Sequence, residues 1–255
     1  MRDIDYIIDF AAHFGRELLF AGANLERANN TMERICKTYS LHEVSIFSLS
    51  SNITLSAKTA DGETHIRQVS VPGPAIHLTK LTKLSRLANK VCEEAPEPKK
   101  LQDMLYEAIM VPSYGTWIDM GAFVLAITCL CRIFGGNWQE LVVTALVTVM
   151  AYWISRPLRR ANLNRIIINI TNMFAAASVF FFTTWINFTS DIMCMLTAIS
   201  LMFIPGVPLV NSMRNILCGN EMNGILEFLK VVLETLTICL GVFIAYALFG
   251  RWYTW

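Results

Sequence analysis

The chain has 255 residues, of which 54% are hydrophobic and 16% charged, and its formal net charge at pH 7 is +1. Soluble globular domains carry about 25% charged residues, so this composition argues against an ordinary soluble protein. A net charge this close to zero also gives no reason to expect nucleic-acid binding.

The charged residues are distributed unevenly along the chain. Residues 1–117 contain 13 Lys and Arg and 14 Asp and Glu, whereas residues 118–255 contain only 8 and 6. We therefore expect a mostly α-helical membrane protein in which a cytosolic α+β domain (1–115) precedes a transmembrane domain of about five helices (116–255). The N-terminus carries three early aspartates and no long apolar core, so it does not resemble a signal peptide.

Hydrophobic spacing predicts helices and strands in the N-terminal half. Apolar residues at helical spacing predict one helix over 3–20 and a second after Asn24. Residues 43–59 are typical of two short strands with a polar turn at Ser50–Asn52, and residues 64–71 of a third strand. These elements indicate a small α+β domain.

Two further helices are expected before the membrane segments. Pro and Gly at 71–75 break the chain, and a helix over 76–94 follows, with Ile76 and Leu81 among its inward-facing residues. A solvated turn then leads to a helix from about 99 to 110. His77 and Lys80 near the break could line a regulatory pocket, and a solvated helix start is the simpler alternative.

The sequence shows no catalytic or metal-binding pattern. There is no nucleophile elbow, no P-loop and no Gly-rich dinucleotide turn. The seven cysteines form no CxxC pair, and we expect them to be reduced and to pack as small hydrophobic groups. We therefore expect no enzyme activity, no cofactor and no metal. The four histidines are scattered without metal-ligand spacing: His13, His42, His65 and His77.

Apolar segments of the C-terminal half are long enough to cross a bilayer, which takes about 20 residues. The predicted spans are 117–134, 141–154, 166–186, 192–210 and 225–249.

Arginines indicate how these spans are oriented. Four of them lie at 156–165, and positively charged loops stay in the cytoplasm. Counting spans from that loop places the N-terminal domain and residues 211–224 in the cytoplasm and Trp255 outside. We expect a multi-pass protein of the plasma or inner membrane.

A proline-containing break interrupts the fourth predicted span. Pro205, Gly206 and Pro208 are expected to open the helix and to free backbone carbonyls at 201, 202 and 204. Broken helices of this kind flank substrate sites in transporters. The alternative is that the span simply ends there. The polar groups that could hold a carboxylate follow within three turns: Asn211, Ser212, Arg214 and Asn215.

Charged and polar residues inside the spans are further candidates. Asp119 and Glu234 could couple transport to protons, but Asp119 could instead anchor the interface and Glu234 could pair with Lys230 one helical turn away. Asn172 could bind substrate, or it could form a hydrogen bond between helices that stabilises their packing. Asp191 is expected to cap the fourth span.

Several motifs resemble the threonine/serine exporter family. They are "FIPGVPLVNSMRNILCGNEMNG", "FAGANLERANNTMERI", "VPGPAIHLTKLTKLSRLANKV" and "GGNWQEL", and they extend over nearly the whole chain. The family pattern often has an acidic residue where this chain has Asn215.

The resemblance implies a function and a partner. Full-length members carry two membrane halves and this chain has one, so it resembles the larger, YjjP-type subunit of a split exporter. It would work with a small YjjB-type membrane subunit, or as a homo-oligomer, within membrane lipid. The implied activity is proton-driven export of a small polar carboxylate, serine or threonine. A dicarboxylate such as succinate is the alternative substrate, and a membrane-tethered cytosolic sensor or enzyme is the alternative class of protein.

Overall fold

The computed structural model describes residues 3–49, 51–72, 76–112, 114–161 and 163–250. They form two compact units. The first unit comprises Met1–Pro112 and Val210–Glu227, and the second comprises Ser113–Leu209 and Phe228–Trp255. The segment Val210–Glu227 thus packs with the N-terminal residues.

The first unit combines helices with a three-stranded antiparallel sheet in the order β1-β2-β3. Its elements are α1 (Asp3–Phe20), α2 (Leu25–Thr38), β1 (His42–Leu49), β2 (Asn52–Lys58), β3 (Thr64–Ser70), α3 (Leu78–Glu94) and α4 (Pro98–Ile109). The helices and strands predicted for this part of the chain are all present.

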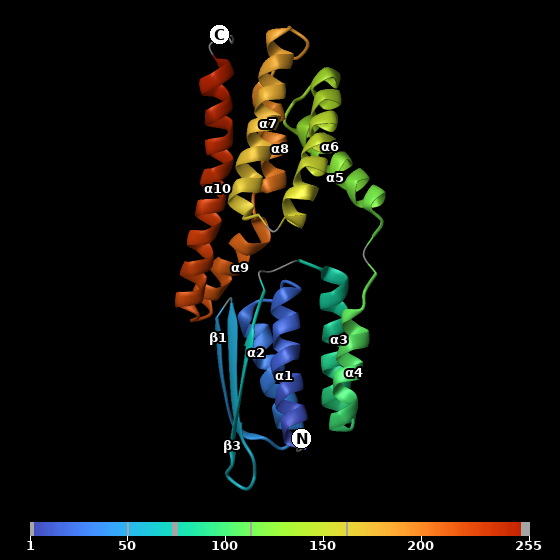
Figure 1. Cartoon of the computed structure of the whole chain (residues 1–255), viewed down its shortest axis with the longest axis vertical. Helices are drawn as coiled ribbons and strands as arrows, with labels where there is room; N and C mark the ends of the chain where they lie inside the picture. Colours follow the sequence, from blue (N-terminus) through green and yellow to red (C-terminus); the bar gives the residue numbers. More distant parts are fainter. Residues whose placement is uncertain (1–2, 50, 73–75, 113, 162, 251–255) are drawn as a thin grey trace. The chain divides into compact units, whose positions relative to one another are not determined.

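Helix α1 is the centre of the first unit. It contacts β2 and β3 of the sheet as well as α2, α3 and α4 (Figure 1). Helix α2 can pack closely because Gly15 leaves room for Met32, whose sulfur would lie only 2.2 Å from a Cβ added at Gly15. The side chain of Asn24 caps α2 by accepting a hydrogen bond from the backbone N–H of Arg27.

Among the three strands of the sheet, the middle one contributes the most residues to this core. β1 and β2 form a hairpin in which Leu49 pairs with Asn52. Alternate residues of β2 are fully buried, as period-2 geometry requires when one face of a sheet covers a core. They are Ile53, Leu55 and Ala57.

The start of α3 differs from the prediction. The helix begins at Leu78, and Ile76, expected to face inward, is 47% exposed because it lies before the first turn. His77 caps the helix by accepting from the backbone N–H of Lys80. The Lys80 ammonium is buried, pairs with Glu17 and lies 4.9 Å from the centre of the Phe20 ring. His77 and Lys80 therefore both have partners within the first unit. Part of the expected break, residues 73–75, falls outside the described residues.

The second unit is helical and apolar. Four helices in the described part of the chain are long and apolar enough to cross a membrane, or up to five if the bent pair α8 and α9 counts as one span. The helices are α5 (Thr116–Ile133), α6 (Trp138–Arg160), α7 (Arg165–Trp185), α8 (Ile192–Phe203), α9 (Gly206–Leu217) and α10 (Glu221–Phe249). The boundary between the two units falls inside α9 and α10.

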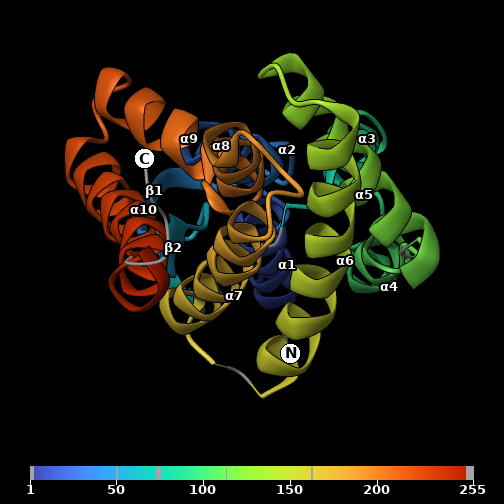
Figure 2. The ribbon, with the colours of Figure 1, turned by 90° about the horizontal axis from the view of Figure 1, so that it is seen from above.

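Helix α7 lies at the middle of the second unit, with α6 on one side and α10 on the other (Figure 2). α10 approaches closely at Gly241, where an added Cβ would lie 2.8 Å from the backbone oxygen of Ile170. Small residues at helix contacts are common in membrane proteins because they let backbones approach. Large apolar side chains remain exposed on the outside of the helices, as contact with lipid requires: Leu125, Leu146, Leu233 and Phe243 among them.

Two membrane segments differ from the prediction. The second was expected to end at 154 with an arginine-rich loop after it, but α6 continues to Arg160 with Pro157 inside the helix. The fourth is not one helix: α8 has 12 residues, or about 18 Å at 1.5 Å per residue, and a bend of 59° separates it from α9. Alone, α8 is too short for a bilayer core of about 30 Å.

Candidate functional site

A row of polar side chains follows one face of α7. Arg165, Asn169 and Asn172 recur at the spacing that places residues on the same side of a helix. The two asparagines are 3% and 0% exposed. A buried amide is costly unless its donors and acceptor find partners, so this face of α7 is the first candidate for a functional site within the apolar helices.

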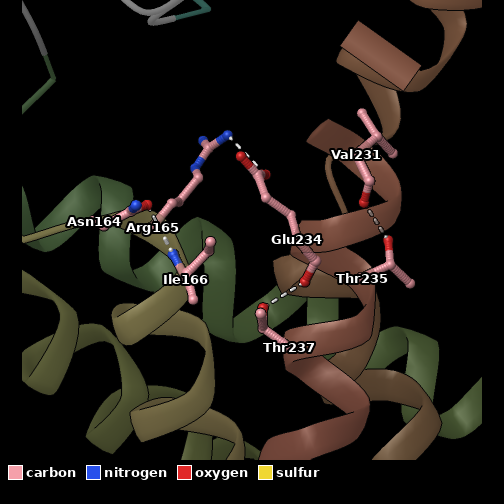
Figure 3. A network of polar contacts seen from close by, with 7 residues as sticks. All are labelled: Asn164, Arg165, Ile166, Val231, Glu234, Thr235 and Thr237. Carbon is pink, nitrogen blue, oxygen red and sulfur yellow. Dashed lines mark hydrogen bonds and ion pairs between the residues drawn. The ribbon is translucent and has the colours of Figure 1, made fainter. Parts of the chain in front are cut away.

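The side chain of Glu234 on α10 lies next to Arg165, the first residue of this row (Figure 3). Its Oε2 lies 3.5 Å from Nη1 of Arg165, and the carboxylate side chain is only 6% exposed whereas that of Arg165 is 55% exposed. At 3.5 Å the contact is an ion pair rather than a short hydrogen bond. Among the described residues Glu234 forms no ion pair with Lys230, so the alternative pairing within α10 is wrong.

Asn172 bridges two helices. Its Nδ2 donates to Ser155 Oγ of α6 at 3.0 Å and to the backbone oxygen of Ile168 at 2.7 Å. This confirms the expected hydrogen bond across helices. Its Oδ1, however, has no partner among the described residues, and neither has Nδ2 of Asn169. One acceptor and one donor on adjacent turns of α7 therefore remain open to water or to a polar ligand.

Asp119 lies on a different pair of helices. It is exposed in the first turn of α5, where the hydroxyl of Tyr152 on α6 donates to its Oδ2 at 3.0 Å. Nearby, Arg156 of α6 donates to Thr116 Oγ1 at 3.1 Å. Asp119 therefore contacts α6, and Glu234 contacts α7, so the two carboxylates proposed for proton coupling belong to separate contacts.

The proline break has a more closed backbone than expected. The carbonyl of Ile204 is not free, because the N–H of Gly206 donates to it at 2.9 Å. The carbonyl of Pro205 begins α9 by accepting from the N–H of Leu209. Pro208 lies in the first turn of α9, where helical N–H groups have no intrahelical partner and proline costs little.

The polar residues after the break lie in the first unit. Asn211 and Arg214 line a pocket there with residues of α2 and α3. Ser212 is fully buried, and Asn215 donates to the carboxylate of Glu227 at 2.9 Å, so an acidic partner is present at this position, supplied by α10. The predicted substrate residues are thus divided between the units, with Asn172 in the second.

Sequence reasoning missed several residues of these sites. Arg165 was counted only as a loop charge, and Asn169 was not considered. The periodicity of α7 could have found both, since they share a face with Asn172. Among the described residues no three His, Cys, Asp or Glu side chains come together as a metal site.

Comparison with protein families identifies the chain's relationships. Residues 9–249 match the family model ThrE, described as "Putative threonine/serine exporter". The chain belongs to this family. It is therefore a membrane protein of an exporter family, and the helices of the second unit have the length and apolarity that such a protein needs.

Two curated relatives carry the same name, "Probable succinate transporter subunit YjjP". The protein of Escherichia coli is 25% identical over 138 residues, so this chain spans about half its length (54% of each chain). The protein of Klebsiella aerogenes is 24% identical over 205 residues, which cover 79% of this chain and 78% of that protein. The ThrE family chain is thus similar to YjjP-type subunits. No solved structure matches it.

Proposed function

We propose that this chain is one subunit of a secondary transporter that exports a small polar carboxylate metabolite. The observation that carries the proposal is the buried carboxylate of Glu234, paired with the half-exposed Arg165, near two buried amide groups of α7 that each have a polar atom without a partner among the described residues, within helices apolar enough to cross a membrane. Ionisable groups placed inside a membrane are costly and commonly mark transport pathways. A helix bundle that only tethers a sensor or enzyme needs none of them.

Two substrate classes are supported by different comparisons. The family description names threonine and serine, and the names of both relatives specify succinate. All three molecules carry a carboxylate, which arginine recognises through paired N–H donors. We propose serine or threonine as the first class to test and a dicarboxylate as the second.

The substrate residues proposed from the sequence belong to two different units. Asn172 contributes from α7, and Asn211, Ser212 and Arg214 contribute after the break formed by Pro205, Gly206 and Pro208. Glu234 and Asp119 are proposed to bind and release protons. Glu234 is the stronger candidate because it is buried against a cation, whereas Asp119 is exposed.

The proposed topology has five passes, with the N-terminus in the cytoplasm and the C-terminus outside. The packing of Val210–Glu227 with the N-terminal residues supports it, because two segments of one unit lie on the same side of the membrane. Reporter fusions at 137, 160, 189 and 255 test each loop in turn, and a cytoplasmic C-terminus would contradict the proposal.

A native thiol offers a second topology test. Cys218 is exposed at the end of α9. In a variant that retains only Cys36 and Cys218, a membrane-impermeant maleimide should label inverted vesicles and leave intact cells unlabelled. Cys36 is an internal negative control, because burial raises the pKa of its thiol to about 12 and keeps it protonated and unreactive.

A smaller membrane protein is the proposed partner, since the relatives are named as subunits. Proteoliposomes holding this chain, with and without a YjjB-type subunit, should be loaded with labelled serine, threonine or succinate. We expect efflux driven by a proton gradient only when both subunits are present. Full activity of the chain alone would refute the two-subunit proposal, and no efflux of any carboxylate would refute the transport function.

A further inference from the structure

A pocket of about 570 Å³ lies in the first unit. Its lining comes from the end of α1 and the turn after it, from α2 and α3, and from Asn211 and Arg214 of α9, and all of these residues belong to that unit. The volume falls in the range of about 300–1,000 Å³ that is typical of small-molecule sites. This pocket is separate from the buried groups of α7 and α10.

The pocket is strongly basic. Its lining holds three arginines, Arg27 and Arg34 of α2 and Arg214 of α9, and a single acidic residue, Glu26. Arg214 Nη2 lies 3.9 Å from Glu26 Oε2, a distance at which the pair is weak. The pocket therefore carries a formal charge of +2, which a dianion would neutralise and a zwitterionic amino acid would not.

Several donors in the pocket are unused. Asn24 is 8% exposed; its Oδ1 caps α2, and its Nδ2 has no partner among the described residues. The guanidinium of Arg34 likewise has no hydrogen-bond or ion-pair partner within the part of the chain that the structure describes. Arg27 donates to Ser85 Oγ at 2.7 Å, and its other guanidinium N–H groups have no partner among the residues that the structure describes.

The spacing of these donors favours a ligand with two anionic ends. Arg27 and Arg34 are seven residues apart on α2, or about 10 Å along the helix axis. Asn24 lies one turn before Arg27, at the other end from Arg34. A single compact anion can engage one end, whereas a short chain with a carboxylate at each end can engage both through paired donors.

We propose that this pocket binds a small dicarboxylate. The inference rests on the proposed function only in taking Asn211 and Arg214 as part of the substrate's route, and it selects the dicarboxylate among the substrate classes named above. Asn24 Nδ2 and Arg27 hold one carboxylate, and Arg34 holds the other. Arg214 brings α9 to the bound anion, so that binding is sensed by the segment that follows the proline break.

Binding can be measured without transport. The full chain, purified in detergent, should be titrated calorimetrically with succinate, threonine and inorganic phosphate. We expect saturable succinate binding and at least about tenfold weaker binding of the other two probes, a difference of about 1.4 kcal/mol. Absence of succinate binding, or phosphate binding as tight as that of succinate, would overturn the proposal.

Matched variants test the residues. Arg34→Gln, which breaks no contact within the described chain, should weaken succinate binding at least about tenfold. Asn24→Ser keeps a residue that can cap the helix, removes the Nδ2 amide donor and leaves only a shorter hydroxyl, so it should weaken binding severalfold. Arg86→Gln, at an exposed arginine of α3 outside the pocket, should bind as the parent does. Parental affinity in both Arg34→Gln and Asn24→Ser would overturn the assignment.

The transport assay separates this inference from the proposed function. If the two-subunit vesicles export a carboxylate but the chain binds no succinate, the pocket inference fails and the transport function stands. If succinate binds and depends on Arg34 but no carboxylate is exported, the transport function fails and the binding site stands.

Discussion

Two buried glutamates of the second unit have opposite surroundings. Glu140, in the first turn of α6, is 1% exposed, and its Oε1 accepts from the N–H and the hydroxyl of Ser190 and from the N–H of Asp191 at 2.9 to 3.1 Å. Its Oε2 accepts from the N–H of Asn137. Glu234, in the middle of α10, is 4% exposed, and Arg165 at 3.5 Å is the partner of its carboxylate among the described residues.

These different surroundings predict different consequences when each carboxylate is changed. A carboxylate that accepts four hydrogen bonds is fixed in position, because its removal would break contacts that hold two loops together. A carboxylate with one long ion pair loses little when its partner moves. Glu140 therefore holds the ends of helices together, whereas the contact of Glu234 with Arg165 can be broken with little structural loss, as the proposed role of Glu234 in transport requires. Four changes test this contrast.

Glu140→Ala should have the largest effect. It leaves the backbone donors of Asn137, Ser190 and Asp191 without their acceptor in a buried place, at a cost of about 1–3 kcal/mol for each unsatisfied group. We expect a large fall in the melting temperature in detergent and in the yield of folded protein. Glu140→Gln, which keeps an acceptor oxygen, should lose less. A variant Glu140→Ala as stable as the parent would show that these bonds are unimportant.

Glu234→Gln should abolish coupling while the protein stays folded. The amide keeps the shape of the side chain but cannot carry a proton, so we expect transport to fall at least about tenfold and to lose its dependence on the pH gradient. Thermal stability should change by less than about 1 kcal/mol, since the ion pair is long and Arg165 is half exposed. Glu221→Gln, at an exposed position of the same helix, is the control. Unchanged proton-driven efflux would remove Glu234 from the mechanism.

Gly241→Val should weaken the contact between Glu234 and Arg165 by changing the packing of α10 against α7. The added side chain would meet the backbone oxygen of Ile170 and Cβ of Met173, both 2.8 Å from its Cβ, and would push α10 from α7. We expect a loss of about 1–3 kcal/mol in stability and a severalfold fall in transport as Arg165 and Glu234 separate. Gly219→Ala is not a suitable control, because Gly219 has a positive φ of 83°. Gly121→Ala, with open space around it, is suitable and should behave as the parent.

The proline break should give the smallest effect. Pro205 lies between α8 and α9, and replacing it by alanine restores a donor where the helix bends, so Pro205→Ala should lower transport a fewfold. Pro208→Ala is the matched comparison and should have a smaller effect, because Pro208 lies in the first turn of α9, where proline costs little. Efflux assays at equal protein levels compare the two. A stronger effect at Pro208 than at Pro205 would contradict this account of the bend.

Local sequence determined the helices and strands of the first unit. The apolar spacing of α1 and α2, the cap at Asn24 and the alternation in β2 are properties of neighbouring residues, and each is present where it was expected. The long apolar segments of α5, α7 and α10 could also be recognised from the sequence, because a helix that crosses a bilayer needs an uninterrupted apolar stretch. The proline break could also be seen in the sequence, although hydrogen bonds to the carbonyls of Ile204 and Pro205 make the bend more closed than its residues suggested.

Only the tertiary structure decided which distant polar groups meet. Arg165 and Glu234 are 69 residues apart, Ser48 and Asn223 are 175 apart, and Arg214 reaches Glu26 from the other end of the chain. A periodic pattern reports which face of an element is buried, but it does not report what that face is buried against. The pocket of three arginines and the partner of Glu234 therefore follow from packing between elements, which no local stretch of this sequence contains.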